Sequence, residues 1–150
     1  EAALGPDDLD DLRLLVSPET DRLGQRLDWA VEVAPEALGA WPAAKVRQIA
    51  LNLLLNASAA AGQGGRLALE ATAAQGTGLR IAVSDDGPGL GPEALERLLS
   101  DAPTRPGGGL GLRLVRELVA TLGGRIEHRR EGGVTAIAVS LPAGATAAAA

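Results

Sequence analysis

Residues 45–62, which read KVRQIALNLLLNASAAAG, decide the fold of this chain. Their apolar side chains recur at helical spacing, which predicts one long helix with a continuous apolar face. That face consists of Val46, Ile49, Ala50, Leu53, Leu54, Ala57 and Ala61. Leu51 and Leu55 fall on the opposite side, so we expect the helix to be buried nearly all round.

The exception on this helix is a polar strip. Gln48, Asn52 and Asn56 are spaced four residues apart and therefore share one face. A buried amide without a partner costs about 1–3 kcal/mol, so these side chains need hydrogen-bonding or metal partners. We expect the partners to be a magnesium ion and the phosphates of a nucleotide, because an amide oxygen is a neutral hard ligand that suits Mg²⁺.

The composition limits the function classes. The chain has 150 residues, of which 46% are hydrophobic, enough for one domain with an aliphatic core. Its only aromatic residues are Trp29 and Trp41, so base stacking on aromatic side chains is not available. A net charge of −5 argues against nucleic acid or an anionic membrane as the main partner. The lack of cysteine excludes disulfides and zinc–thiolate sites.

The sequence contains no apolar run of the length of a transmembrane helix and no signal peptide. It also contains no methionine, so we expect the chain to be part of a longer protein.

Before the long helix, the pattern predicts a helix over 7–23 that Pro18 breaks or kinks, a half-buried strand over 27–33 and a loop over 34–41. Pro42 suits the first turn of the long helix.

After the long helix, strands and helices alternate. We expect an antiparallel strand pair over 66–72 and 79–84, a short helix over 92–99, a polar loop over 100–109, an amphipathic helix over 110–122 and a closing hairpin over 125–130 and 134–141. The helix over 110–122 should direct Leu114, Val115, Leu118, Val119 and Leu122 inward. The predicted fold is an α+β two-layer sandwich, a mixed sheet of about five strands with about three helices on one face. Residues 1–142 form the predicted domain, and 143–150 a low-complexity tail.

Two glycine-rich motifs accompany the polar strip. In DDGPG, residues 85–89, a carboxylate at a strand end can accept a hydrogen bond from the exocyclic amine of adenine, whereas guanine presents a carbonyl at the same edge. In GGGLGL, residues 107–112, glycines before a helix leave backbone N–H groups for phosphates. Each motif alone is more often structural, but the three together, in this order, favour a nucleotide site.

The three motifs resemble the N, G1 and G2 boxes of the ATP-binding catalytic domain of bacterial sensor histidine kinases. These domains belong to the gyrase–Hsp90–kinase–MutL (GHKL) superfamily, which has the Bergerat fold. The matching segments are 48–57, 85–89 and 107–112, with the family's usual ending at 122–126 and 139–142.

The resemblance implies a role for each matching residue. Asn56 ligates Mg²⁺ with Asn52 beside it, and both belong to the catalytic site. Asp85 takes the adenine amine, while Gly87 and Gly89 let the backbone approach the base. The phosphate side and the hinge of a lid consist of Gly107, Gly109 and Gly111, with Leu110 and Leu112.

The chain also departs from the family pattern. Ala59 and Ala60 stand where the family often has a basic and an aromatic residue, so we expect Arg105 or Arg113 to supply the cation. The chain has no phenylalanine, and Leu98-Leu99 fills the place of the family's Phe-containing box. The lid between Gly89 and Gly107 is short, and we expect it to be mobile without nucleotide.

Asn52 distinguishes phosphoryl transfer from hydrolysis. Hydrolytic relatives carry a glutamate at this position to activate water, and an asparagine cannot act as a general base. The only histidine, His128, lies in a strand, whereas the family's phosphoacceptor lies on an upstream helical hairpin. We therefore expect His128 to be an ordinary surface residue.

The sequence as a whole predicts the catalytic fragment of a protein-histidine kinase that binds ATP and Mg²⁺ on the cytoplasmic side. Its expected partners are a histidine-bearing dimerisation domain of the same kinase and a downstream response regulator, without direct contact with a membrane or nucleic acid. Two alternatives stay open: a non-catalytic docking or phosphotransfer module with the same fold, and an ATPase of the gyrase or MutL type.

Overall fold

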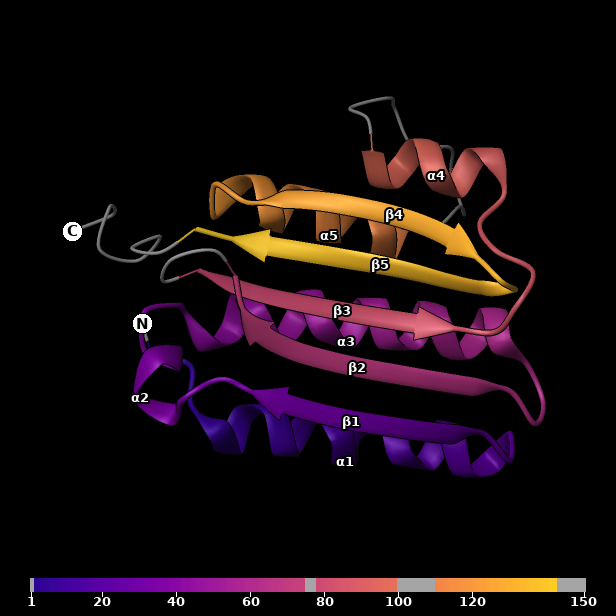
Figure 1. The fold of residues 1–150 in the computed structure, drawn as a ribbon, viewed down its shortest axis with the longest axis horizontal. Helices are drawn as coiled ribbons and strands as arrows, with labels where there is room; N and C mark the ends of the chain where they lie inside the picture. Colours follow the sequence, from indigo (N-terminus) through magenta and orange to yellow (C-terminus); the bar gives the residue numbers. More distant parts are fainter. Residues whose placement is uncertain (1, 75–77, 100–109, 143–150) are drawn as a thin grey trace.

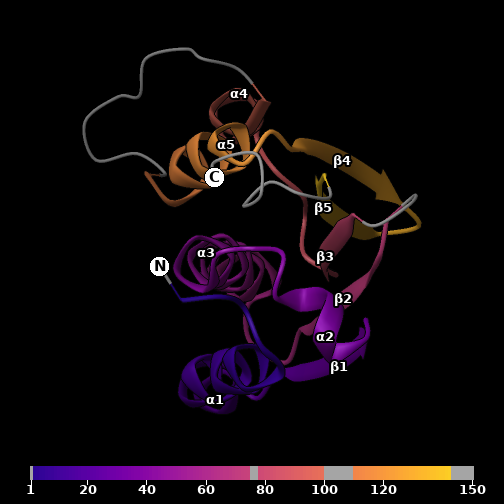
Figure 2. The ribbon, with the colours of Figure 1, turned by 90° about the vertical axis from the view of Figure 1, so that its left-hand side faces the viewer.

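A computed structural model of the chain describes residues 2–74, 78–99 and 110–142. They form a two-layer α+β sandwich, with one five-stranded sheet on one side and the helices on the other (Figures 1 and 2). The strands are β1 (Arg26–Glu32), β2 (Arg66–Ala73), β3 (Leu79–Asp85), β4 (Arg125–Glu131) and β5 (Val134–Leu141). The helices are α1 (Pro6–Arg22), α2 (Pro35–Leu38), α3 (Ala43–Ala61), α4 (Pro92–Leu99) and α5 (Leu110–Thr121).

The sheet is mixed, with strand order β1-β2-β3-β5-β4. Only β1 and β2 pair in parallel, and the other neighbours are antiparallel. A parallel pair requires a long crossover connection, and α2 and α3 supply it here. The crossover carries α3 across the middle of the sheet, between α1 and α5 (Figure 2).

The core lies between the sheet and this helical layer. On α3, Val46, Ile49 and Ala50 are fully buried, as the periodicity predicted. Facing them, β3 alternates buried and half-buried residues along its whole length, with Ile81 and Val83 turned to the helices. The opposite face of the sheet carries no helix (Figure 2).

Gln25, which precedes β1, completes the end of α3. Its Nε2 donates to the carbonyl oxygens of Ser58 and Gly62, each at 2.8 Å, and its Oε1 accepts from Ser58 Oγ at 2.7 Å. The last carbonyls of a helix have no partner within the helix, so this side chain supplies what the helix lacks. Gly62 ends α3 with a φ of +68°, as expected of a helix-terminating glycine.

The first part of the chain differs from the sequence prediction at three points. The predicted loop over 34–41 contains the one-turn helix α2, whose Leu38 is buried. Pro18 does not break α1. A proline has no N–H to donate to the carbonyl four residues earlier, here that of Leu14, but both residues lie on the exposed side of the helix, where water can bind that carbonyl. Pro42 is the N-cap of α3 rather than a residue of its first turn.

Leu55, predicted to be buried on the far side of α3, and Leu114, predicted to point inward from α5, are both exposed instead. Leu55 on α3 is 43% exposed and Leu114 on α5 is 36% exposed. A two-layer sandwich covers helices from the sheet side only, so the outer face of the helical layer meets solvent. On α5 the inward face is formed by Leu112, Val115 and Val119, and Leu122, which directly follows the helix, is buried as well.

None of the helices within the described part of the chain combines the length and the hydropathy that crossing a membrane would require.

Candidate functional site

The polar strip of α3 is partly paired within the protein. Gln48 Nε2 donates to Asn52 Oδ1 at 3.1 Å, and Asn52 Nδ2 donates to the carbonyl oxygen of Gly111 at 3.4 Å. Both ends of the Asn52 amide are therefore engaged. Asn56 is half-buried, and within the described residues its side chain makes no hydrogen bond. Of the three amides, Asn56 is thus the one with no hydrogen bond to another described residue.

Asp85 is the last residue of β3 and is only 6% exposed. Its Oδ1 accepts from the backbone N–H of Gly87 at 2.9 Å. Burial raises the pKa of Asp85 above its ordinary value; the hydrogen bond from Gly87 and the charge of Arg130 oppose this shift, and the charge of Asp86 adds to it. No described residue donates to Oδ2, so this buried carboxylate retains an acceptor.

The turn after Asp85 lies directly against the end of α3. A Cβ added to Gly87 would lie 2.2 Å from the carbonyl oxygen of Ala60. At Gly89 the backbone has a φ of +91°, and a Cβ there would lie 3.0 Å from Cδ of Arg130. Both glycines are therefore required by the packing of the protein itself, in addition to any close approach to a base.

The first turn of α5 contacts the same helix. The carbonyl of Gly111 accepts from Asn52, as described above, while Leu112 is buried in the core. Arg113 Nε donates to Glu117 at 3.2 Å, one turn further along α5. Arg105, Gly107 and Gly109 lie outside the described residues, as does the part of the predicted lid over 100–106, whereas the first part of the lid contains α4. For Leu110 only the backbone position in α5 is described.

These contacts bring the three motifs together along one face of α3. Asn52, Asn56 and Ala60 lie on successive turns of that face. Asn52 contacts Gly111, and Ala60 packs against Gly87. Asn56 therefore lies between the two glycine-rich segments. The carboxyl ends of α3, β3 and β4 and the start of β5 all meet at one end of the sandwich, on the right in Figure 1.

Two further residues that lie at this end of the sandwich, beside Asp85, were not predicted from the sequence. Thr135, in β5, is 1% exposed and lies opposite Asp85 in the β3–β5 register. Arg130, in β4, donates from Nη1 to the carbonyl of Gly87 at 2.9 Å and to Thr135 Oγ1. No local pattern marks them, because strand pairing across the sheet creates their neighbourhood.

The prediction that His128 is an ordinary surface residue is only partly correct. The residue is half-buried, and its Nε2 is buried without a hydrogen-bond partner among the described residues.

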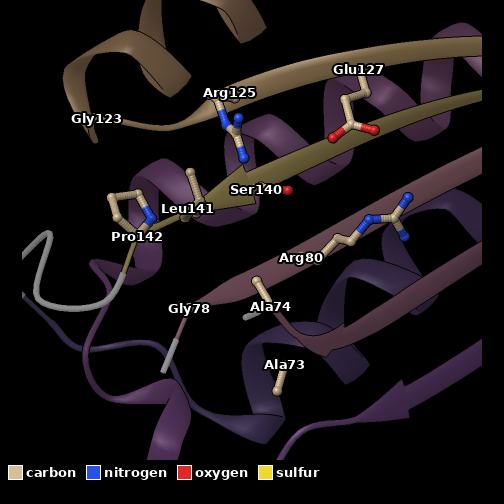
Figure 3. A pocket seen from close by; sticks show the side chains of 10 residues that line it. All are labelled: Ala73, Ala74, Gly78, Arg80, Gly123, Arg125, Glu127, Ser140, Leu141 and Pro142. Atoms are coloured by element: carbon tan, nitrogen blue, oxygen red, sulfur yellow. The ribbon is translucent and has the colours of Figure 1, made fainter. Parts of the chain in front are cut away.

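A pocket of about 470 Å³ lies elsewhere, at the opposite end of the sheet on its helix-free face (Figure 3). Arg80, Arg125, Glu127 and Ser140 are its polar lining residues. It contains none of the residues of the three motifs, so the size of a cavity does not identify the candidate site. The site is identified by the contacts among α3, β3 and α5.

Comparisons with known proteins agree with this architecture. Residues 42–145 match the family model described as histidine kinase-, DNA gyrase B- and HSP90-like ATPase. The signal transduction histidine-protein kinase/phosphatase MprB of Mycobacterium ulcerans is 37% identical over 111 residues, covering 67% of this chain and 22% of MprB. The adaptive-response sensory kinase SasA of a Synechococcus species is 36% identical over 89 residues, 55% of this chain and 23% of SasA.

Solved structures show the same fold. The catalytic domain of the histidine kinase ThkA has a TM-score of 0.76 at 18% identity, over 91% of this chain and 92% of that domain. Full-length ShkA in complex with AMPPNP has a TM-score of 0.73 at 30% identity, over 95% of this chain and 31% of ShkA.

The chain spans about a fifth of the length of the first curated relatives that it matches. The family model covers more than half of the chain, and the fold agrees with that of the ThkA catalytic domain over most of both chains. The chain therefore belongs to the family of histidine kinase-, DNA gyrase B- and HSP90-like ATPases, as a catalytic domain of the sensor histidine kinase type.

Proposed function

We propose that this domain binds Mg²⁺-ATP between α3, the turn after β3 and the start of α5, and that it phosphorylates a histidine on a dimerisation domain outside this chain. The observation that carries the proposal is the buried carboxylate of Asp85, which lies beside the polar face of α3 with one oxygen engaged by Gly87. The complex of ShkA with AMPPNP supports a nucleotide as the ligand of such a domain.

Asp85 would recognise adenine. Its unengaged oxygen can accept a hydrogen bond from the exocyclic amine of adenine, whereas guanine presents a carbonyl oxygen at the corresponding edge. A carboxylate and a carbonyl repel each other and share no proton, so the proposed site prefers ATP to GTP. The burial of Asp85 strengthens this selection, because a mismatched partner would leave a buried acceptor unpaired.

Asn56 would bind the metal. Within the described residues no three His, Asp or Glu side chains are close enough to hold a metal ion by themselves. A magnesium ion here would therefore depend on the amide oxygen of Asn56, with water and nucleotide phosphates as its further ligands. When bound, the ion supplies positive charge that neutralises the phosphates. Asn52, held by Gln48 and Gly111, would fix the start of α5 next to this position.

Asn52 also favours transfer of the ATP phosphate to a protein side chain over hydrolysis of ATP. Asn52 occupies the place of the hydrolytic glutamate, and an amide cannot take a proton from water. The domain would act by positioning ATP for an incoming histidine. His128 does not fit the acceptor role, because its Nε2 is buried. The acceptor and the response regulator that receives its phosphate would both lie outside this chain, on the cytoplasmic side where ATP is available.

Calorimetric titration with ATP and with GTP, each with and without Mg²⁺, tests the proposal. We expect binding of ATP that strengthens with Mg²⁺, weaker binding of GTP and no sustained phosphate release. An absence of heat at millimolar ATP would instead support the docking module. Steady phosphate release that disappears in Asn52→Ala would support a gyrase- or MutL-type ATPase.

A further inference from the structure

An arginine outside all three motifs contacts the adenine side of the proposed site. Arg130 is the penultimate residue of β4, at the edge of the sheet. Its Nη1 donates to the carbonyl oxygen of Gly87 at 2.9 Å and to the hydroxyl of Thr135. One guanidinium thus links the turn after β3 to the first residues of β5.

Strand register explains why this contact forms. Arg130 pairs with Thr135 across the β4–β5 hairpin, and Thr135 pairs with Asp85 across β5 and β3. The three residues form one row across three strands, with Thr135 in the middle. Neighbouring side chains of a strand point to opposite faces of the sheet, and Arg129 accordingly lines a shallow cavity on the helix-free face.

The side chain of Arg130 also covers the second glycine of the turn. A Cβ on Gly89 would lie 3.0 Å from Arg130 Cδ and 3.2 Å from its Nε and Nη1. Together with the hydrogen bond to Gly87, this contact holds the turn from its outer side. The end of α3 holds the same turn from its inner side, through Ala60.

The charge of Arg130 acts on the carboxylate of Asp85. Burial favours the neutral form of Asp85 and raises its pKa; the hydrogen bond from Gly87 opposes this shift, and the positive charge of Arg130 opposes it to a smaller extent. The other charged group acting on Asp85 is Asp86, which adds to the shift. Its strand partners on β2 and β5, Leu67 and Thr135, are uncharged, and so is Ala60 of α3, which packs against the neighbouring Gly87.

We propose that Arg130 is a positioning residue for nucleotide selection, which holds the turn over 85–89 so that the carboxylate of Asp85 is placed to accept the adenine amine. This inference rests on the proposed function, since it assigns Arg130 a task in the same site. It does not place Arg130 in contact with the nucleotide.

Two substitutions separate the charge of Arg130 from the hydrogen-bonding geometry of its guanidinium group. Arg130→Gln keeps a side chain with a donor but removes the charge, and Arg130→Lys keeps the charge but loses the forked geometry. Arg129→Gln is the matched control, since that residue lies next in the strand on the other face of the sheet. Affinities for ATP and GTP would be measured by calorimetry between pH 5 and 8, after circular dichroism and thermal melting have confirmed that each variant folds.

We expect Arg130→Gln to bind ATP about tenfold more weakly at pH 7, with little change for GTP. Its ATP affinity should also begin to fall at a higher pH on acidification, because Asp85 without the cation takes up a proton sooner. Arg130→Lys should keep the pH dependence of the unaltered chain with a several-fold lower affinity. Arg129→Gln should behave as the unaltered chain does.

Normal ATP affinity and pH dependence in folded Arg130→Gln would overturn the inference while leaving the proposed function intact. If Arg130→Gln does not fold, a changed pH dependence in Arg130→Lys would overturn it in the same way. Failure of the unaltered chain to bind ATP would instead overturn the proposed function.

Discussion

The carbonyl oxygen of Ala60 lies 2.2 Å from the point that a Cβ on Gly87 would occupy. Any side chain at position 87 would have to displace either the last turn of α3 or the turn after β3. Both carry residues of the proposed site, Asn56 on the helix and Asp85 at the strand end. The missing side chain of Gly87 therefore sets the spacing between Asn56 and Asp85, the two residues proposed to bind the metal and the adenine.

Gly87→Ala should lower the free energy of unfolding by about 1–3 kcal/mol, the usual cost of forcing extra atoms into a packed region. Urea unfolding followed by circular dichroism measures this loss. Gly91→Ala is the matched control, because no heavy atom lies within 4 Å of a Cβ there and its φ is not positive. Equal stability of the two variants would contradict the close approach of Gly87 to α3.

Asp85→Asn should weaken the preference for ATP over GTP, because an amide can donate to the guanine carbonyl as well as accept from adenine. The measurement is the ratio of the two affinities by calorimetry at pH 7. An unchanged ratio in the folded variant would contradict the role of Asp85.

The same substitution should alter how stability depends on pH. The pKa of Asp85 is raised in the folded state, chiefly by burial, so the folded protein binds the proton more tightly than the unfolded chain does. Its contribution to stability is therefore lost as the pH rises from the ordinary aspartate pKa to the raised one. Asp85→Asn should lack this loss, so urea unfolding across acidic pH should show the stability of the variant rising relative to that of the unaltered chain as the pH increases. A profile parallel to that of the unaltered chain would contradict the raised pKa.

Asn56→Ala should reduce ATP affinity in the presence of Mg²⁺ by about tenfold and leave affinity in the presence of EDTA unchanged. The half-buried position of Asn56 leaves room for the loss of its amide without unfolding the domain. Calorimetry measures the ATP affinity of the variant with Mg²⁺ and with EDTA, and the measurement in EDTA serves as the control. Equal losses under both conditions would point to a role for Asn56 in packing.

Gln25→Ala should destabilise the domain by about 1–3 kcal/mol, because it leaves the carbonyls of Ser58 and Gly62 without their shared donor. ATP affinity of the folded variant should not change, since Gln25 makes these contacts at the end of α3 and not on its polar face. Gln63→Ala, an exposed glutamine just beyond the same helix, should have little effect on either property. Similar melting temperatures for both variants would contradict the capping role.

Local patterns were sufficient for most of the secondary structure. The spacing of Val46, Ile49 and Leu53 predicts α3, and the alternation of Ile81 and Val83 predicts β3, because helix and strand periodicities follow from backbone geometry alone. The polar strip of α3 and the glycine turns were equally readable, since each is a short contiguous segment. The exposure of Leu55 and Leu114 was not, because burial depends on which elements cover a helix.

The sequence by itself thus determined the elements, the α+β class and the three motifs of the site. Tertiary structure alone decided which distant residues support them: Gln25 at the end of α3, Ala60 against Gly87, and Arg130 and Thr135 beside Asp85. The physical reason is that propensity and periodicity act over a few neighbouring residues. The pairing of β3 with β5 and of β5 with β4 instead joins positions that are far apart in the chain, through a register that only the folded sheet defines.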